Sequence, residues 1–151
     1  MPLVIPNQFG YVVAVGALSS IVPVVLGAQV NGARKRANVP YPHMYATQAE
    51  CAEDKSKLIF NCYQRAHHNF LENYPQFLFL LGVSGLQYPE IAAGAGVTWI
   101  IGRLLYAFNY QTGDPSKRNG GIAGIHALGL LTLMGLGITT GVKLSIAAIQ
   151  G

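Results

Sequence analysis

The chain has 151 residues, of which 51% are hydrophobic and only 11% are charged. A soluble domain carries roughly 25% charged residues, so this sequence has too few charges to cover a surface that faces water. The low charge also excludes a disordered chain. The composition therefore predicts one small integral membrane domain over residues 1–151.

The formal net charge of +4 comes from basic residues that are grouped in short segments and do not form a stripe. The groups lie at residues 34–36, Lys55, Lys57, Lys117 and Arg118. Such segments are typical of loops that contact anionic lipid headgroups, so we expect membrane lipid, and no nucleic acid, as a partner. Cys51 and Cys62 match no zinc or disulfide spacing, and we expect no metal.

The first predicted membrane span covers residues 9–33, because no charged side chain occurs before Arg34 and about 20 apolar residues cross the hydrocarbon core. It lacks the basic start of a cleavable signal peptide, so we interpret it as retained, with a kink at Pro23. The second span, residues 58–87, is apolar only in its second half. Its first half carries Arg65, His67, His68, Asn69 and Glu72.

The third predicted span covers residues 90–110 and contains Arg103, and the fourth covers residues 121–149 with His126 and Lys143 as its ionisable residues. Strand patterns are absent, so the fold class is all-α, a four-helix transmembrane bundle. The first and third loops hold most of the lysine and arginine. The positive-inside rule therefore places these loops in the cytosol and both termini on the far side.

Polar side chains form one face on each of the two central spans. The first face comprises Arg65, Asn69 and Glu72, at i, i+4 and i+7; the second comprises Arg103, Tyr106 and Tyr110, at i, i+3 and i+7. Ionisable groups at membrane depth are costly and mark a function or a tight partner. Together the faces would offer cations, a carboxylate and phenols to a zwitterionic ligand. Alternatively, Arg65 and Glu72 only neutralise each other and Arg103 braces the bundle.

Two long motifs resemble the MAPEG family, membrane-associated proteins in eicosanoid and glutathione metabolism. They are FNCYQRAHHNFLENYP at residues 60–75 and GRLLYAFNYQTGDPSKR at residues 102–118. The second motif, with YPHMYAT at residues 41–47, is similar to the microsomal glutathione S-transferase 3 branch. The resemblance implies a homotrimer of four-helix subunits in the endoplasmic reticulum or the outer mitochondrial membrane. Glutathione, as co-substrate, would bind between neighbouring subunits, with the active site facing the cytosol.

The resemblance also assigns site residues. The glutathione contacts it implies are Arg34, Arg65, His67, Asn69, Glu72, Tyr106, Tyr110 and Arg118. Among these, Arg34 would come from the adjacent subunit. Arg118 matches the arginine that activates the thiol, with Lys117 as the other possibility, and Lys35 matches a basic residue proposed as a proton donor.

The expected activity is attack by the glutathione thiolate on lipophilic electrophiles, and reduction of lipid hydroperoxides. A free thiol has a pKa of about 8.5 and is mostly protonated at neutral pH, so a fixed guanidinium is needed to favour the anion. One alternative is a non-catalytic lipid-binding scaffold of the same superfamily. Another is a haem protein that uses two of the four histidines as axial ligands; these are His43, His67, His68 and His126.

Overall fold

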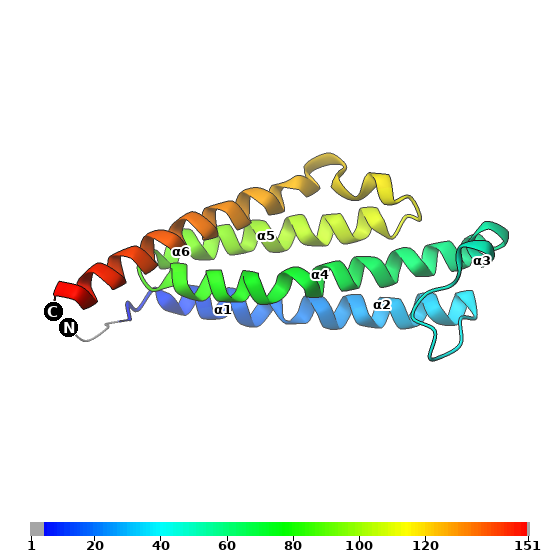
Figure 1. Ribbon diagram of the computed structural model, residues 1–151, viewed down its shortest axis with the longest axis horizontal. Helices are drawn as coiled ribbons and strands as arrows, with labels where there is room; N and C mark the ends of the chain where they lie inside the picture. Colours follow the sequence, from blue (N-terminus) through cyan, green and yellow to red (C-terminus); the bar gives the residue numbers. More distant parts are fainter. Residues whose placement is uncertain (1–4, 151) are drawn as a thin grey trace.

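The computed structural model describes residues 5–150, and in this range its regular elements are helices that run side by side as an elongated rod (Figure 1). The long helices are α1 (Phe9–Ser19), α2 (Ile21–Ala37), α4 (Lys55–Gly85), α5 (Pro89–Tyr110) and α6 (Ile125–Gln150). The short ones are α3 (Gln48–Glu53) and the 3₁₀ turns η1 (Pro115–Asn119) and η2 (Gly121–Gly124). Helices α1 and α2 follow each other along one row of the rod.

Within residues 5–150, three helical segments are long and apolar enough to cross a membrane: Phe9–Ala37, Pro89–Tyr110 and Gly121–Gln150. They overlap the spans predicted at residues 9–33, 90–110 and 121–149. Helix α4 overlaps the predicted span 58–87, but it is not one of the three, because polar residues fill its first half. The chain is therefore a helical membrane protein in which α4 packs against α2, α5 and α6.

The row formed by α1 and α2 is interrupted at Ser20, about one turn before Pro23. Proline has no N–H, and its ring clashes with the carbonyl four residues earlier, which here belongs to Ser19. The Ser20 N–H instead donates to the Ala17 carbonyl at 3.2 Å, and the Ser19 hydroxyl donates to the Gly16 carbonyl at 2.6 Å. The kink predicted at Pro23 is thus a break in the helix just before it.

The core lies where α4 meets α5. Phe77 and Trp99 stack with ring centroids 3.9 Å apart, and the Ser84 hydroxyl donates to the Leu133 carbonyl at 2.8 Å, which ties α4 to α6. The outer surface is apolar as well, since Val24 on α2 is 70% exposed. An apolar exterior around close-packed helices is expected in lipid. Lipid tails are as apolar as the protein core, so apolar side chains are stable on both the inner and the outer surfaces of the bundle.

Helices α5 and α6 approach closely at Gly129, where a Cβ atom would lie 2.6 Å from the Ala95 carbonyl oxygen and 2.8 Å from the Trp99 nitrogen. Neither backbone atom can move without shifting α5. We therefore expect Gly129→Ala to lower the free energy of unfolding by about 1–3 kcal/mol, measured as a fall in melting temperature in detergent. Gly135→Ala on the same helix is the matched control, because its Cβ would meet open space. Equal losses in the two variants would contradict this account of the α5–α6 contact.

Loops 38–47 and 111–121 lie at the end of the rod away from the start of α1 and the end of α6 (Figure 1). The spans predicted at residues 9–33 and 58–87 leave a loop between them; instead α2 continues to Ala37 and α3 forms within this loop. A capping box between Thr47 and Glu50 begins α3 and explains why it forms. The hydrogen bond from Lys57, together with those from Thr47, lowers the pKa of Glu50 to about 2.

Candidate functional site

The polar face of α4 is assembled as its spacing predicts, because residues at i, i+4 and i+7 share one side of a helix. Arg65 holds Glu72 through two hydrogen bonds, Nη1 to Oε1 at 2.6 Å and Nη2 to Oε2 at 3.3 Å. Asn69 Nδ2 donates to Glu72 Oε2 at 3.4 Å. The ion pair considered as a purely structural alternative is thus present. Its side chains nevertheless remain 42% and 53% exposed, so a ligand has access to them.

The polar face of α5 meets that of α4 through one hydrogen bond, from Arg103 Nη2 to Asn69 Oδ1 at 2.6 Å. The Arg103 guanidinium lies 4.6 Å from the centre of the Tyr106 ring, and the Tyr106 and Tyr110 rings are 5.9 Å apart. The two faces therefore form one cluster, which we call the central polar cluster. It comprises Arg65, Asn69, Glu72, Arg103, Tyr106 and Tyr110.

A second polar feature is a groove of about 340 Å³ between α2 and α4, here called the α2–α4 groove. It is lined by Gly27, Val30, Asn31, Arg34, Tyr41, Gln64, His67 and His68. Arg34 is 7% exposed, lies between the Tyr41 and Phe60 rings, and donates to the His43 carbonyl at 2.7 Å. Since residues two apart on a helix are separated by roughly 200°, His67 points to a different side of α4 from Arg65.

Sequence reasoning missed Tyr45, which the first loop brings onto α4. Its hydroxyl lies 3.0 Å from His68 Nδ1, and His68 Nε2 lies 3.2 Å from Gln64 Nε2. Burial raises the pKa of the Tyr45 phenol, although the nearby Arg65 acts in the opposite direction. Tyr45 therefore joins the first loop to His68 on α4 through its hydroxyl. The motif at residues 41–47 was the only signal for it in the sequence.

The basic residues of the third loop lie on η1. Arg118 is exposed and donates from Nη1 to the Pro115 carbonyl at 2.8 Å, whereas Lys117 Nζ lies 3.6 Å from Asp114 Oδ2. Within the described residues, Arg118 makes no hydrogen bond or ion pair with the central polar cluster. Lys35 is exposed on the last turn of α2.

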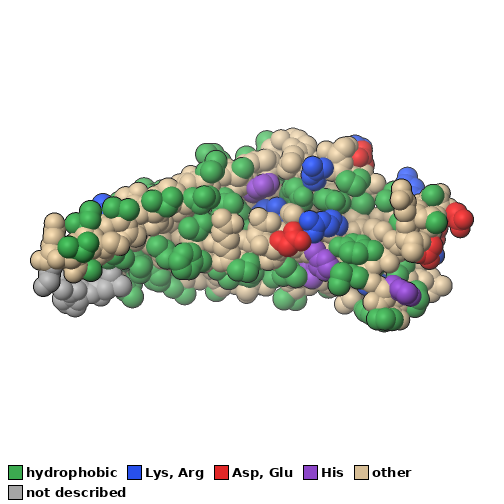
Figure 2. All heavy atoms as spheres, in the orientation of Figure 1, with side chains coloured by type: hydrophobic (Ala, Val, Ile, Leu, Met, Phe, Trp, Pro, Cys, Tyr) green, Lys and Arg blue, Asp and Glu red, His purple; other side chains and the backbone are tan. Residues whose placement is uncertain are grey.

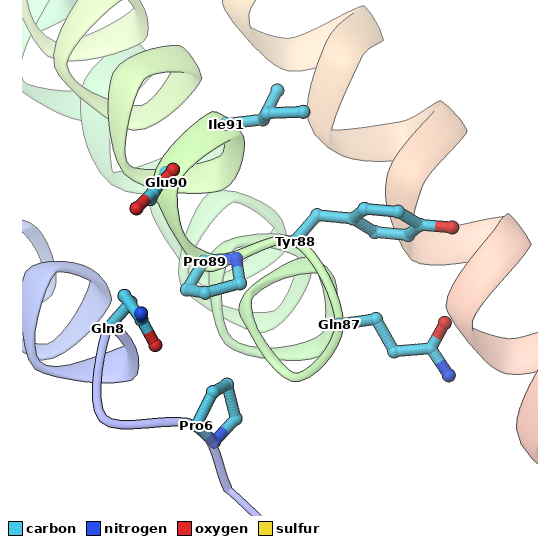
Figure 3. A pocket seen from close by; sticks show the side chains of 7 residues that line it. All are labelled: Pro6, Gln8, Gln87, Tyr88, Pro89, Glu90 and Ile91. Atoms are coloured by element: carbon cyan, nitrogen blue, oxygen red, sulfur yellow. The ribbon is translucent and has the colours of Figure 1, made fainter.

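Figure 2 shows basic, acidic and histidine side chains gathered midway along one face of the rod. A larger groove of about 360 Å³ lies far from them, between the start of α1 and the α4–α5 turn (Figure 3). Its lining is Pro6, Gln8, Gln87, Tyr88, Pro89, Glu90 and Ile91. That groove contains no guanidinium or histidine, so the central polar cluster offers the richer chemistry.

Comparison with known proteins finds a match to a family model. The model, described as the MAPEG family, matches residues 12–140. This range includes the central polar cluster, the α2–α4 groove and η1. Among residues 5–150, no three histidine, cysteine, aspartate or glutamate side chains gather where they would hold a metal ion.

Proposed function

The chain belongs to the MAPEG family, whose model matches most of its length, and on this premise we propose that it is a membrane glutathione transferase closest to the microsomal glutathione S-transferase 3 branch. The family includes glutathione transferases and other membrane enzymes. The observation that carries the proposal is the central polar cluster, in which guanidinium, amide, carboxylate and phenol groups gather where α4 meets α5. Glutathione is the co-substrate.

The chemistry of glutathione matches this set of groups. Its two carboxylates suit the Arg65 guanidinium, its ammonium suits Glu72, and its amides suit Asn69 and the phenols of Tyr106 and Tyr110. Binding would exchange the exposed Arg65–Glu72 contacts for contacts with the ligand. Because an exposed ion pair contributes little to stability, this exchange costs the protein little.

The α2–α4 groove supports an oligomeric site. Arg34 and His67 face a different side of α4 from Arg65. One subunit therefore does not surround a single ligand with both the α2–α4 groove and the central polar cluster. In a closed ring of identical subunits, each interface joins two different surfaces. We propose a homotrimer in which the α2–α4 groove of one subunit faces the central polar cluster of the next, with glutathione between them. Each chain forms a single domain, and α4 crosses the membrane beside the three apolar segments.

Arg118 is the proposed thiol-activating residue. Arginine stays protonated in any environment, and its guanidinium would stabilise the thiolate through a charge-assisted hydrogen bond. Arg118 is exposed, so it is free to exchange its Pro115 contact for the sulfur. Lys117 is paired with Asp114, which favours Arg118 for this role. Lys35 is the proposed proton donor to the product.

Two reactions follow from one activated thiolate. When the thiolate attacks an electrophilic carbon, a C–S bond forms. In a substitution, the leaving group departs with its electron pair. In an addition, the electron pair of the attacked multiple bond takes up a proton. With a lipid hydroperoxide, the sulfur attacks the O–O bond and yields a sulfenic acid and an alkoxide, which is protonated to the alcohol. A second glutathione then displaces water from the sulfenic acid and gives the disulfide. Lipophilic substrates enter from the bilayer. Glutathione enters from the cytosol, at the end of the rod where loops 38–47 and 111–121 lie, and the protein resides in the endoplasmic reticulum membrane.

Calorimetric titration of glutathione into the detergent-purified protein tests this function. We expect Arg65→Met to weaken binding roughly 30- to 100-fold, because it leaves a ligand carboxylate without its partner. Lys143→Met is the matched control, because Lys143 contacts Tyr88, which lines the groove between the start of α1 and the α4–α5 turn. The glutathione affinity of this variant should equal that of wild type. Absence of glutathione binding by wild type would contradict the proposal and favour the non-catalytic scaffold.

A further inference from the structure

Arg103 is a buried cation in the second half of α5, with 4% of its surface exposed. The ion pairs of the described residues join Lys57 to Glu50, Arg65 to Glu72 and Lys117 to Asp114, and none includes Arg103. Its Nε is buried without a hydrogen-bond partner within the described structure. A buried charge without a counterion is expensive, so its retention requires a reason beyond bracing the helices.

The short contact of Arg103 with Asn69 supplies that reason. Guanidinium groups only donate hydrogen bonds, so the side of the Asn69 amide that faces Arg103 at 2.6 Å is its oxygen. The amide nitrogen consequently faces Glu72 Oε2, at 3.4 Å. If the amide turned over, its oxygen would face the Glu72 carboxylate and its NH₂ group would face a cation, and both contacts would be repulsive.

We propose that Arg103 is a positioning residue for the glutathione site: it holds the Asn69 amide with its NH₂ group directed toward Glu72 and the ligand. This inference rests on the proposed function and deepens it. The Tyr106 ring, 4.6 Å from the guanidinium, also stabilises the cation. Asn69 then binds the ligand, whereas Arg103 acts through Asn69.

A double-mutant cycle on glutathione affinity tests the inference. We expect Arg103→Met and Asn69→Leu each to weaken binding by about tenfold or more, and the double variant to bind no more weakly than the weaker single variant. Arg103→Lys should restore part of the affinity, because an ammonium also donates to the amide oxygen. The KM for glutathione should rise in Arg103→Met while the KM for a lipophilic electrophile such as 1-chloro-2,4-dinitrobenzene stays unchanged.

Asn69→Asp separates positioning from stability. It keeps an acceptor for Arg103 but has no NH₂ group to donate and places a carboxylate oxygen beside Glu72, so glutathione affinity should fall by about tenfold, and the melting temperature reports separately whether the variant folds. Full affinity in Asn69→Asp would overturn the inference even if Arg103→Met failed to fold.

Other outcomes separate this inference from the proposed function. Wild-type affinity in Arg103→Met, or losses that simply multiply in the double variant, would also overturn the inference and leave the proposed function intact. Failure of the wild type and of the Lys143→Met control to bind glutathione would overturn both.

Discussion

Mixed oligomers of two inactive variants, Arg34→Met and Arg65→Met, are expected to regain about one quarter of the wild-type activity. In the proposed arrangement each site takes Arg65 from one subunit and Arg34 from its neighbour. A site is intact only where an Arg34→Met copy supplies the central polar cluster and an Arg65→Met copy supplies the α2–α4 groove. With equal, random mixing each condition holds for about half of the positions, so about one quarter of the sites are complete.

The measurement is glutathione-dependent turnover after the two variants are co-expressed with different tags and co-purified. The control mixes Arg34→Met with the double variant Arg34→Met/Arg65→Met, which leaves no subunit able to supply Arg34 and should stay inactive. Arg34 also contacts the Tyr41 ring of the first loop and the Phe60 ring of α4. Loss of activity in Arg34→Met could therefore come from impaired folding alone. Recovery in the mixture would exclude that explanation, whereas a co-purified mixture without activity would contradict the shared site.

Arg118→Ala is expected to lower kcat about 25-fold at pH 7, with little change in the KM for glutathione. Lowering the thiol pKa by two units from about 8.5 requires about 2.7 kcal/mol of preferential stabilisation of the thiolate. One charge-assisted hydrogen bond to a guanidinium supplies about that much. Without it, the rising limb of the pH–rate profile should move from about pH 6.5 to about pH 8.5.

Lys117→Ala is the matched control for Arg118→Ala, because it removes the neighbouring cation of the same turn. Lys117 is paired with Asp114 at 3.6 Å, so its removal should change kcat less than about threefold. A larger loss in Lys117→Ala than in Arg118→Ala would assign the activating role to Lys117. An unchanged pH–rate profile in both variants would contradict thiol activation from η1.

The sequence predicts local faces well, because helical periodicity determines which neighbouring side chains share a side. Arg65, Asn69 and Glu72 are assembled as their spacing predicts, and their ion pair follows from the same geometry. The contact between Asn69 and Arg103 spans 34 positions and depends on how α4 packs against α5. Periodicity gives each face but not the register between two helices, so this contact was not predictable.

Loop residues were harder to place than helical ones. The break at Ser20 follows from Pro23 by simple sterics, but the burial of Arg34 depends on aromatic rings from the first loop and from α4. Tyr45 reaches His68 only because the loop folds back over α4. Such contacts join segments without a regular repeat, and composition or spacing carries no signal for them.

The central claim, that the protein binds glutathione and holds its sulfur as a thiolate, is tested most directly by ultraviolet difference absorbance. Thiolates absorb at about 240 nm, and free glutathione at neutral pH is mostly protonated. Adding glutathione to the purified wild-type protein should give a thiolate band that saturates with site occupancy, and S-methylglutathione should bind without producing it. Saturable glutathione binding with no thiolate band would contradict the claim.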